Sequence, residues 1–321
     1  MDSDKKKYVK FVSTRDDICI YNKPFWLNAA CGKNNWDAIV IEENGEVTAA
    51  VPYHVKTRFG IKGVLQPQLT KFLDIWIKPM DGLKKERVLH YQFKWLGEIA
   101  KRLTALGADY YDQNYSGRMN NLEPFTWEGF SNELRYTFII RPGQSIAEID
   151  KQMNNRIRAS IRKVEKTCCI EELYDTDLFY ELQSLTFTRK GMKNPDSKER
   201  FERIYRACMA NNACRLLAVK DKQGDICCAG FYVFDNRYVY ELLLGKRTDK
   251  GNLNYKAYMT HEMIRYAAET GRGFDFDGSM IASIADHNRR FGAEPVPYYR
   301  SRKMQTKSLW KRMAIHIGKR V

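Results

Sequence analysis

Apolar and polar residues alternate in short runs through the first half of the chain. Residues 37–42 (DAIVIE) and 46–53 (EVTAAVPY) have the two-residue period of half-buried strands, and Asn44-Gly45 between them is typical of a tight hairpin turn. Residues 84–106 instead repeat apolar side chains every three or four positions, which predicts one long amphipathic helix. The same criteria predict further strands at 61–66, 108–113 and 135–140.

The second half opens with helical periodicity. Residues 145–166 are predicted as one helix, whose apolar stripe consists of Met153, Ile157, Ile161 and Val164. Downstream, the pattern predicts strands at 168–173, 215–220, 225–234, 238–244, 274–277 and 296–301, and helices at 177–189, 197–211, 253–270 and 281–291.

Arg141-Pro142-Gly143 interrupts this pattern near the middle of the chain. Meandering strands followed by a strand–helix–strand crossover indicate the α/β (α+β) class, with mixed sheets flanked by helices on both sides. We therefore expect an N-terminal domain at 1–143, a C-terminal domain at 144–303 that holds the active site, and a basic amphipathic tail at 304–321.

Composition adds a strong positive charge to this picture. The 321 residues are 44% hydrophobic, enough for a large core, and carry a formal net charge of +15. Residues 151–166 contribute +5 and residues 303–321 contribute +6 of that total. Concentrated positive charge predicts an anionic partner, which can be a phosphorylated substrate, a nucleic acid or a lipid surface.

The sequence gives no pattern for a metal site or a disulfide framework. Its eight cysteines form no C-x-x-C pair, and its five histidines form no H-x-x-x-H pair, so we expect reduced thiols packed as small apolar groups and no metal. The N-terminal MDSDKKKYVK has no apolar run after its lysines, and no segment approaches the ~20 apolar residues of a membrane span, so we expect a cytoplasmic protein.

The candidate chemistry lies in residues 238–302. Between the strand and the helix predicted there, the loop GKRTDKGN carries three cations, Lys246, Arg247 and Lys250, followed by Gly251 and Asn252. A loop that opens a helix presents backbone N–H groups to an anion, so these five residues are candidates for binding the pyrophosphate of a cofactor. A flexible basic loop without a ligand is the alternative, and the two stay open.

Several segments here resemble a known family. The strand YVYELLLG, helix 253–270 followed by Gly271, the strand FDFDGS and Phe291-Gly292 are similar to the second half of tandem GNAT-fold acyltransferases, the Fem-type peptidoglycan aminoacyltransferases among them. NNRIRASIRK at 154–163 resembles the arginine-bearing helix that opens that half. The resemblance implies two tandem GNAT-like (acyl-CoA N-acyltransferase fold) domains, an acyl or aminoacyl transfer reaction, and either acyl-CoA or aminoacyl-tRNA as donor.

Two positions depart from the family pattern. Members that use acetyl-CoA carry Q/R-x-x-G-x-G/A before the helix, whereas here the glycine comes one place later and a second glycine is absent. Fem-type enzymes carry a lysine three positions before the Phe-Gly pair, and that position is Asn288 here. Asn288 is therefore the candidate neutral hydrogen-bond donor to the developing oxyanion.

Acidic residues on the two central strands are candidates for the catalytic base. Acyl transfer to an amine needs a group that removes a proton from the ammonium, and Glu241, Asp275 and Asp277 lie on or beside these strands. Asp275 and Asp277, two residues apart, are predicted to share one strand face. The alternative is that these acids pair with arginines such as Arg289 and Arg290.

The basic helix supplies candidates for substrate binding. Arg156, Arg158, Arg162 and Lys163 lie opposite its apolar stripe, where we expect them to bind an anionic substrate unless they are only a solvated face. The leading hypothesis is an N-acyltransferase that forms an amide on an amine of an anionic sugar or cell-envelope precursor. Two alternatives are a Fem-type enzyme that uses aminoacyl-tRNA and a non-catalytic basic module that binds nucleic acid or membrane.

The tail has two interpretations. Leu309, Trp310, Met313, Ala314 and Ile317 form one helical face with basic residues at its edges. Such a helix can lie in a membrane interface and bring the enzyme to a lipid-linked substrate on the inner face of the membrane. The favoured interpretation is that the same face packs on the C-terminal domain, with Trp310 covering its sheet or helices.

Overall fold

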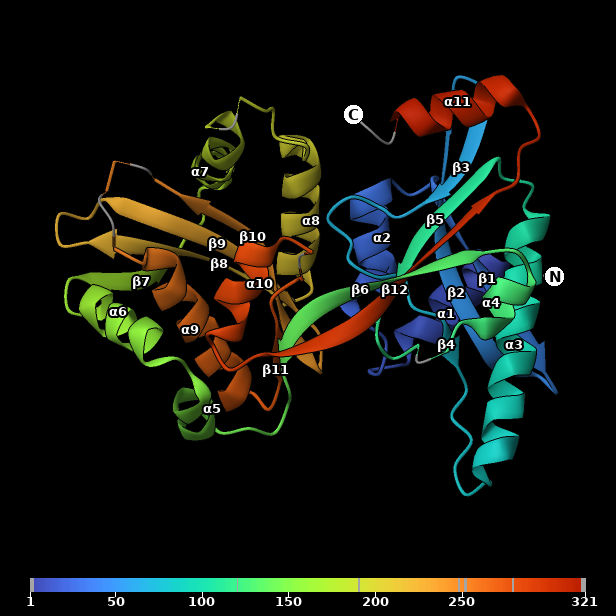
Figure 1. Cartoon of the computed structure of the whole chain (residues 1–321), viewed down its shortest axis with the longest axis horizontal. Coiled ribbons are helices and arrows are strands. Elements are labelled where there is room, and N and C mark those ends of the chain that lie inside the picture. Colours follow the sequence, from blue (N-terminus) through green and yellow to red (C-terminus); the bar gives the residue numbers. More distant parts are fainter. Residues whose placement is uncertain are drawn as a thin grey trace. The chain divides into compact units, whose positions relative to one another are not determined.

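The computed structural model of the chain (Figure 1) describes residues 3–119, 121–189, 191–247, 249–250, 253–278 and 280–318. The chain divides into two compact units, Met1–Arg135 with Pro297–Val321 and Tyr136–Val296. The chain passes from one unit to the other inside two long strands, β6 (Ser131–Ile140) and β12 (Glu294–Met304). The domain limits expected at 143/144 and 303/304 remain a prediction.

The first unit is a mixed sheet with helices on both faces. Its strands are ordered β1-β2-β3-β5-β12-β6; β3 and β5 run parallel, and the pairs β1–β2, β2–β3 and β5–β12 are antiparallel. Besides the two shared strands, its elements are α1 (Asp4–Ser13), η1 (Ile20–Asn22), α2 (Pro24–Cys31), β1 (Trp36–Glu43), β2 (Glu46–Arg58), β3 (Ile61–Leu65), β4 (Trp76–Ile77), α3 (Lys85–Ala105), β5 (Tyr110–Tyr115), α4 (Glu123–Trp127) and α11 (Leu309–Gly318).

Strand β1 shows why helices cover both faces of this sheet. Ile39 and Ile41 belong to the apolar core that includes α3, whereas Ala38 and Val40 belong to the core that includes α1. Successive side chains of a strand point to opposite faces, so an uninterrupted apolar run requires a cover on each side.

The second unit repeats this architecture. Its strands are ordered β6-β11-β10-β9-β8-β7, and β10 and β11 are parallel. Its remaining elements are α5 (Ile146–Gln152), α6 (Asn155–Glu165), β7 (Cys168–Glu172), α7 (Thr176–Thr188), α8 (Lys198–Ala210), β8 (Cys214–Asp221), β9 (Ile226–Phe234), β10 (Tyr238–Lys246), α9 (Tyr255–Glu269), β11 (Gly273–Asp275) and α10 (Ala282–Arg289).

Strand β9 separates the two cores of the second unit. Tyr232 packs in the core formed with α6 and α9. The preceding residue, Phe231, contacts Phe179 of α7 and Phe201 of α8, at ring-centroid distances of 6.5 and 5.4 Å. Figure 1 shows α6 and α9 on one side of this sheet and α7 and α8 on the other. The predicted class, mixed α/β sheets flanked by helices, is therefore confirmed.

The single helix predicted at 145–166 is wrong. The chain forms α5 and α6, separated by Met153 and Asn154 in extended conformations. Asn154 caps α6 because its side chain accepts a hydrogen bond from the Arg156 N–H, at 2.9 Å. Met153 is buried with the other residues of the predicted stripe, so the apolar pattern was correct although the backbone breaks within it.

The favoured interpretation of the tail is also wrong. Helix α11 belongs to the first unit, and its apolar side chains are exposed instead of covering the C-terminal domain. The exposed fractions are 77% for Leu309, 54% for Trp310, 63% for Met313 and 65% for Ile317.

Gly245, near the end of β10, offers a test of this packing. A Cβ at Gly245 would lie 2.6 Å from backbone atoms of Leu182 and Gln183 in α7, so the helix can approach β10 only because the side chain is absent. We expect Gly245→Ala to destabilise the protein by about 2 kcal/mol or more in chemical denaturation. The control is Gly97→Ala in α3, where only a contact at 3.9 Å arises and helix propensity predicts a gain of up to about 1 kcal/mol. Equal effects of the two variants would contradict this packing.

Candidate active site

Strands β10 and β11 separate after a short parallel ladder. They pair over three residues each, from Tyr238↔Gly273 to Tyr240↔Asp275, and β11 then ends while β10 continues to Lys246. On its other side, β10 pairs with β9 and its register shifts between Glu241 and Leu243, so that Leu242 has no opposite residue. The interior of the sheet therefore contains an unpaired strand edge next to a bulge, where a ligand can bind the backbone.

Glu241 lies at this bulge. Its carboxylate accepts a hydrogen bond of 2.6 Å from the Thr260 hydroxyl of α9. Burial raises the pKa of Glu241, while the nearby Lys256 ammonium and the Thr260 hydrogen bond act in the opposite direction. A carboxylate with a raised pKa is a stronger base than an ordinary surface glutamate, as a general base requires.

Asp275 and Asp277 take different positions. Asp275 ends β11 and is buried, and its Oδ1 accepts hydrogen bonds from the Thr137 hydroxyl at 2.6 Å and from the Asp277 N–H at 3.0 Å. Asp277 lies beyond the strand in a left-handed conformation (φ 57°), followed by Gly278 at φ 58°. The prediction that both side chains share one strand face is therefore wrong, because the backbone turns after Phe276.

The turn at Gly278 is tightly packed against β6. A Cβ there would lie 2.9 Å from Thr137 Cα and from the Tyr136 carbonyl oxygen. Asp275 consequently binds two groups that shape the turn, the Thr137 hydroxyl and the Asp277 N–H. Asp275 therefore orders the end of β11.

Asn288 is buried in α10, with 2% of its surface exposed. Its Nδ2 has no hydrogen-bond partner among the described residues. A buried amide without a partner is costly, and this donor is available to an acyl carbonyl or another acceptor. The neighbouring His287 has its pKa lowered to about 4 by burial, with Lys256 and Arg290 adding to the effect, so the imidazole is neutral at physiological pH.

Arg289 and Arg290 do not pair with the candidate acids. Both guanidinium groups bind Asp286 on the preceding turn of α10. The alternative in which these arginines neutralise Glu241, Asp275 or Asp277 therefore does not describe the structure.

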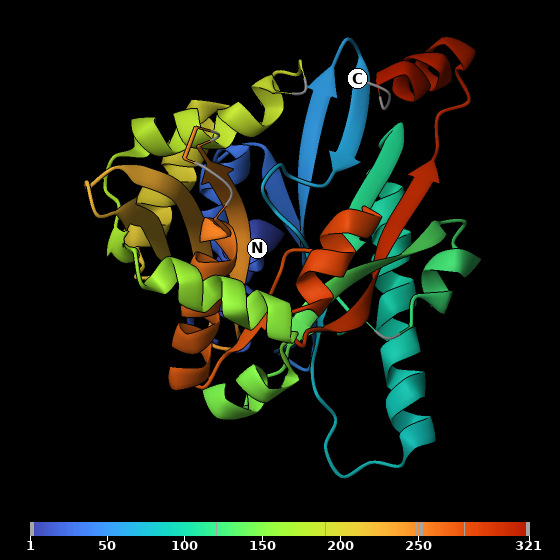
Figure 2. The same ribbon diagram turned by 60° about the vertical axis from the view of Figure 1, so that its left-hand side comes forward.

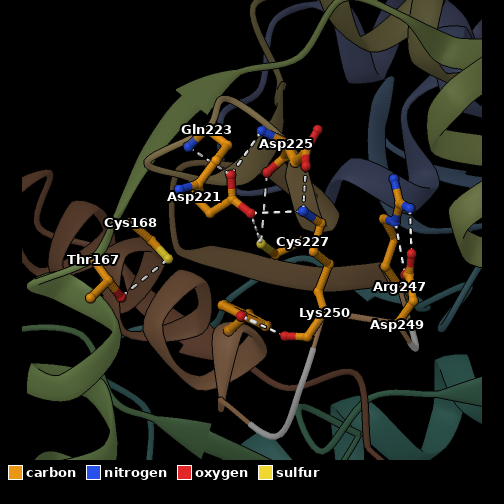
Figure 3. Close-up of polar contacts among 10 residues, drawn as sticks. Thr167, Cys168, Asp221, Gln223, Asp225, Cys227, Arg247, Asp249 and Lys250 are labelled. Atoms are coloured by element: carbon orange, nitrogen blue, oxygen red, sulfur yellow. Dashed lines mark hydrogen bonds and ion pairs between the residues drawn. The ribbon is translucent and has the colours of Figure 1, made fainter.

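The cations of the loop after β10 are largely neutralised by neighbouring acids (Figure 3). The Lys250 ammonium binds Asp221, at 2.8 Å, and also Asp225, and Arg247 forms a forked pair with Asp249. These ion pairs raise the pKa of Lys250 and lower the pKa of Asp249 to about 2. An anionic ligand would therefore have to compete with these carboxylates for Lys250 and Arg247.

The remaining candidates of the loop differ in position. Lys246 donates to the Leu253 carbonyl oxygen at 3.4 Å, and its ammonium lies 5.6 Å from the centre of the Tyr255 ring. Gly251 and Asn252 lie outside the described residues.

The basic residues of α6 are arranged as the pattern predicted. Arg156, Arg162 and Lys163 are exposed, and their side chains make no ion pair or hydrogen bond within the part of the chain that the structure describes. Arg158 is partly buried and binds the Asn155 side chain. Three of the four cations are therefore accessible to an anion, and their binding role stays a prediction.

Three residues that sequence reasoning missed contribute to the site. Thr260 and Tyr232 flank Glu241, and burial together with the charge of Glu241 raises the pKa of the Tyr232 hydroxyl. Lys256, the second residue of α9, lowers the pKa of both Glu241 and His287, so its ammonium lies within electrostatic range of both. The helical spacing of Lys256 and Thr260, four residues apart, was the available signal that both face one side of α9.

No group of three or more His, Cys, Asp or Glu side chains in the described residues is arranged to hold a metal ion. All eight cysteines are free, as expected, and five of them are buried.

Comparison with known proteins identifies the second unit. A family model described as an acetyltransferase (GNAT) domain matches residues 151–283, which include α6 to α9 and the diverging strands. Residues 151–283 form a GNAT-type acyltransferase domain. The sequence matches none of the curated proteins with which it was compared.

Solved structures extend the likeness to both units. FemX superposes with a TM-score of 0.67 at 15% identity, covering 93% of this chain and 96% of FemX. A tandem GNAT protein from the clavulanic acid biosynthesis pathway gives a TM-score of 0.56 at 9% identity, with 94% of each chain covered. The C-terminal domain of a putative lysylphosphatidylglycerol synthetase from Agrobacterium fabrum gives 0.58 at 10% identity, covering 98% of this chain and 95% of that one. These likenesses confirm the predicted tandem GNAT fold. The match of residues 151–283 to the acetyltransferase (GNAT) family model supports the predicted acyltransferase class.

The pKa of Glu241 leads to a test of its environment. The pKa of Glu241 is higher in the folded protein than in the unfolded chain. The free energy of unfolding therefore falls as the pH rises from the unfolded-state pKa to the folded-state pKa, and it stays lower at neutral pH. Gln cannot ionise but can still accept from Thr260. We expect the difference in melting temperature, Glu241→Gln minus wild type, to increase from about pH 4 to neutral pH. Each unit by which the pKa is raised corresponds to about 1.4 kcal/mol in the free energy of unfolding.

Scanning fluorimetry across a pH series measures this trend. Glu165→Gln on the exposed surface of α6 is the matched control and should give a difference independent of pH. A flat difference for Glu241→Gln as well would contradict the burial of its carboxylate.

Proposed function

We propose that the protein is an amide-forming acyltransferase whose acyl group binds where β10 and β11 separate. The observation that carries this proposal is the register skip at Leu242 next to the unpaired edge of β10, with Glu241 at the same place. A free backbone N–H at a bulge can donate to the carbonyl oxygen of an acyl donor and stabilise the oxyanion formed on attack.

In this mechanism Glu241 is the general base. It accepts a proton from the acceptor ammonium, and the freed nitrogen attacks the acyl carbonyl to form the C–N bond and the oxyanion. The oxyanion then collapses, the C–S or C–O bond of the donor breaks, and the second nitrogen proton passes to the departing thiolate or alkoxide. The Leu242 N–H and the Asn288 amide donate to the oxyanion, and Lys256 adds positive charge nearby. Asp275 and Asp277 shape the turn that borders the site.

The acceptor we propose is an amine on an anionic sugar or cell-envelope precursor, free or lipid-linked. The exposed Arg156, Arg162 and Lys163 of α6 support an anionic substrate, because cations without internal partners attract phosphate or carboxylate most effectively. A cytoplasmic protein that contacts the inner face of the membrane through residues 304–321 fits such an acceptor. No helix in the described residues is both long and apolar enough to cross a bilayer.

Two donors are compatible with this chemistry, acyl-CoA and aminoacyl-tRNA. GNAT domains typically use acyl-CoA, whose pyrophosphate would meet the loop after β10. The ion pairs of Lys250 with Asp221 and Asp225 and of Arg247 with Asp249 disfavour that contact. The unpaired cations of α6 suit a long polyanion, so a Fem-type reaction with aminoacyl-tRNA is the second candidate that a specific observation favours.

Removing the proposed base should slow turnover and leave the fold intact. We expect Glu241→Gln to lower kcat by about 10²- to 10⁴-fold, the usual contribution of a general base, with circular dichroism unchanged. The Glu165→Gln control should retain the wild-type rate. A Glu241→Gln enzyme with full rate would show that another group, or the substrate, accepts the proton.

Charge reversal on α6 distinguishes the donors. We expect Arg156→Glu/Arg162→Glu to weaken binding of aminoacyl-tRNA at least tenfold in filter binding at low salt, and less at high salt, because the contact is electrostatic. The matched control is Arg87→Glu/Lys101→Glu, an equal charge change on the exposed face of α3.

Calorimetric titration with acetyl-CoA completes this experiment. Saturable acetyl-CoA binding with no effect of the α6 reversal on tRNA binding would support acyl-CoA as donor. Salt-sensitive tRNA binding without acyl transfer to any amine would instead support the non-catalytic basic module.

A further inference from the structure

Helix α11 presents an apolar face to solvent. Leu309, Trp310, Met313 and Ile317 are each more than half exposed and recur at helical spacing. Among the described side chains of α11, only Lys311 and Ile315 are partly buried. Contiguous exposed apolar side chains of this size mark a surface that binds something apolar.

The helix is fixed with this face outward. On its inner side the Lys311 ammonium binds both oxygens of the Asp109 carboxylate, at 3.0 and 2.9 Å. The Asp109 carbonyl oxygen accepts from the N–H groups of Gln305 and Thr306, which precede the helix. The exposure of the apolar face therefore follows from specific bonds on the opposite face.

The turn between β2 and β3 adds a second apolar group at the same end of the first unit. Phe59 in this turn is 80% exposed and has a left-handed backbone (φ 49°), and the Arg58 guanidinium lies 4.9 Å from its ring centre. Asp109 connects the two elements, because it accepts the Lys62 N–H at the start of β3 and binds Lys311 of α11. Both views show this turn and α11 at one end of the unit (Figures 1 and 2).

Basic residues surround these apolar groups. Lys56, Arg58, Lys307 and Arg312 are exposed next to them along the chain. Beside α11 lies a cavity of about 230 Å³ whose lining contains no acidic residue and consists of Tyr110, Ser131, Arg302, Lys303, Met304, Arg312 and His316. Two cations of this lining have internal partners, because Arg302 binds Glu133 at 2.8 Å and Lys303 donates to the Thr104 hydroxyl at 2.9 Å. Arg312 forms no ion pair within the described part of the chain, so it is the lining arginine that is available to an anion.

We propose that α11 and the β2–β3 turn form a docking surface for a bilayer that contains anionic phospholipid. Phe59, Trp310 and their apolar neighbours enter the interface, and the basic residues and the cavity contact lipid phosphates. Each basic residue close to an anionic leaflet attracts it, and the effect falls off within a Debye length. A second copy of the chain is the weaker candidate, because it would bring a face of the same charge.

The surface is tested by co-sedimentation with vesicles of phosphatidylcholine alone and of phosphatidylcholine mixed with phosphatidylglycerol. We expect wild-type protein to bind only the mixed vesicles. The apolar double variant Trp310→Ser/Met313→Ser should lose about tenfold or more in affinity, since burial of one large apolar side chain is worth roughly that factor. Its melting temperature should be unchanged because both side chains are exposed. The matched control is Trp127→Ser, an aromatic side chain 66% exposed on α4, which should bind as wild type.

A separate variant tests the basic component. Arg58→Glu/Arg312→Glu should reduce binding to mixed vesicles, more strongly at low salt than at high salt. Equal binding to both vesicle types, no binding to either, or an unchanged affinity of the apolar double variant would each overturn the proposal. Sedimentation velocity adds a further contradicting outcome, a wild-type dimer that Trp310→Ser/Met313→Ser dissociates and that binds no vesicles. The assay needs no acyl transfer, so its outcome is independent of the proposed reaction.

Discussion

The short ladder between β10 and β11 determines the geometry of the candidate site. Tyr238 to Tyr240 pair with Gly273 to Asp275, and no further pairs follow among the residues that the structure describes. Gly273 permits this pairing, since a Cβ there would lie 2.5 Å from the Ile140 carbonyl oxygen and 2.6 Å from the Tyr238 ring. A longer ladder would satisfy the backbone of β10 internally, and the strand edge beside Glu241 could not bind a ligand. The candidate site thus lies where the β10–β11 ladder ends.

The distribution of charge gives the second constraint. A chain with a formal charge of +15 repels itself, and many of its cations are neutralised by carboxylates, as Lys250 is by Asp221 and Asp225. In the described part of the chain, Arg156, Arg162 and Lys163 of α6 form no ion pair, so these cations are available to another molecule. Exposed Arg58 and Arg312 are the corresponding cations next to the β2–β3 turn and in α11. Their separation between the two units suits two anionic partners, a substrate for the second unit and a lipid surface for the first.

The sequence predicted the elements whose signal is local. The three- to four-residue period located α3, α7, α8 and α9 to within a few residues, and Glu241 was singled out because it lies on a strand before the loop. Helix α1 was missed because only Tyr8 and Val12 of its ten residues are buried, too narrow a stripe to recognise among its lysines. The break between α5 and α6 was missed because Met153 continues the apolar period through a residue that is not helical.

Contacts between distant elements could not be predicted in this way. Whether Lys250 can bind a pyrophosphate or instead binds Asp221 and Asp225 depends on the distance between the β8–β9 turn and the loop after β10. No spacing in the sequence encodes that distance. The Thr260–Glu241 hydrogen bond likewise needs α9 to be placed on β10. Asp277 shows the same limit at short range, since its left-handed backbone removes it from the face that a two-residue period assigned to it.

In the proposed mechanism the acyl carbonyl binds at the bulge of β10. A crystal structure of the protein with a stable analogue of the acyl donor, an amide-linked aminoacyl adenosine or a non-hydrolysable acyl-CoA, tests it most directly. We expect the carbonyl oxygen at about 3 Å from the Leu242 nitrogen, with the acyl carbon facing the Glu241 carboxylate. An analogue bound elsewhere, with β11 paired along the whole of β10, would contradict it.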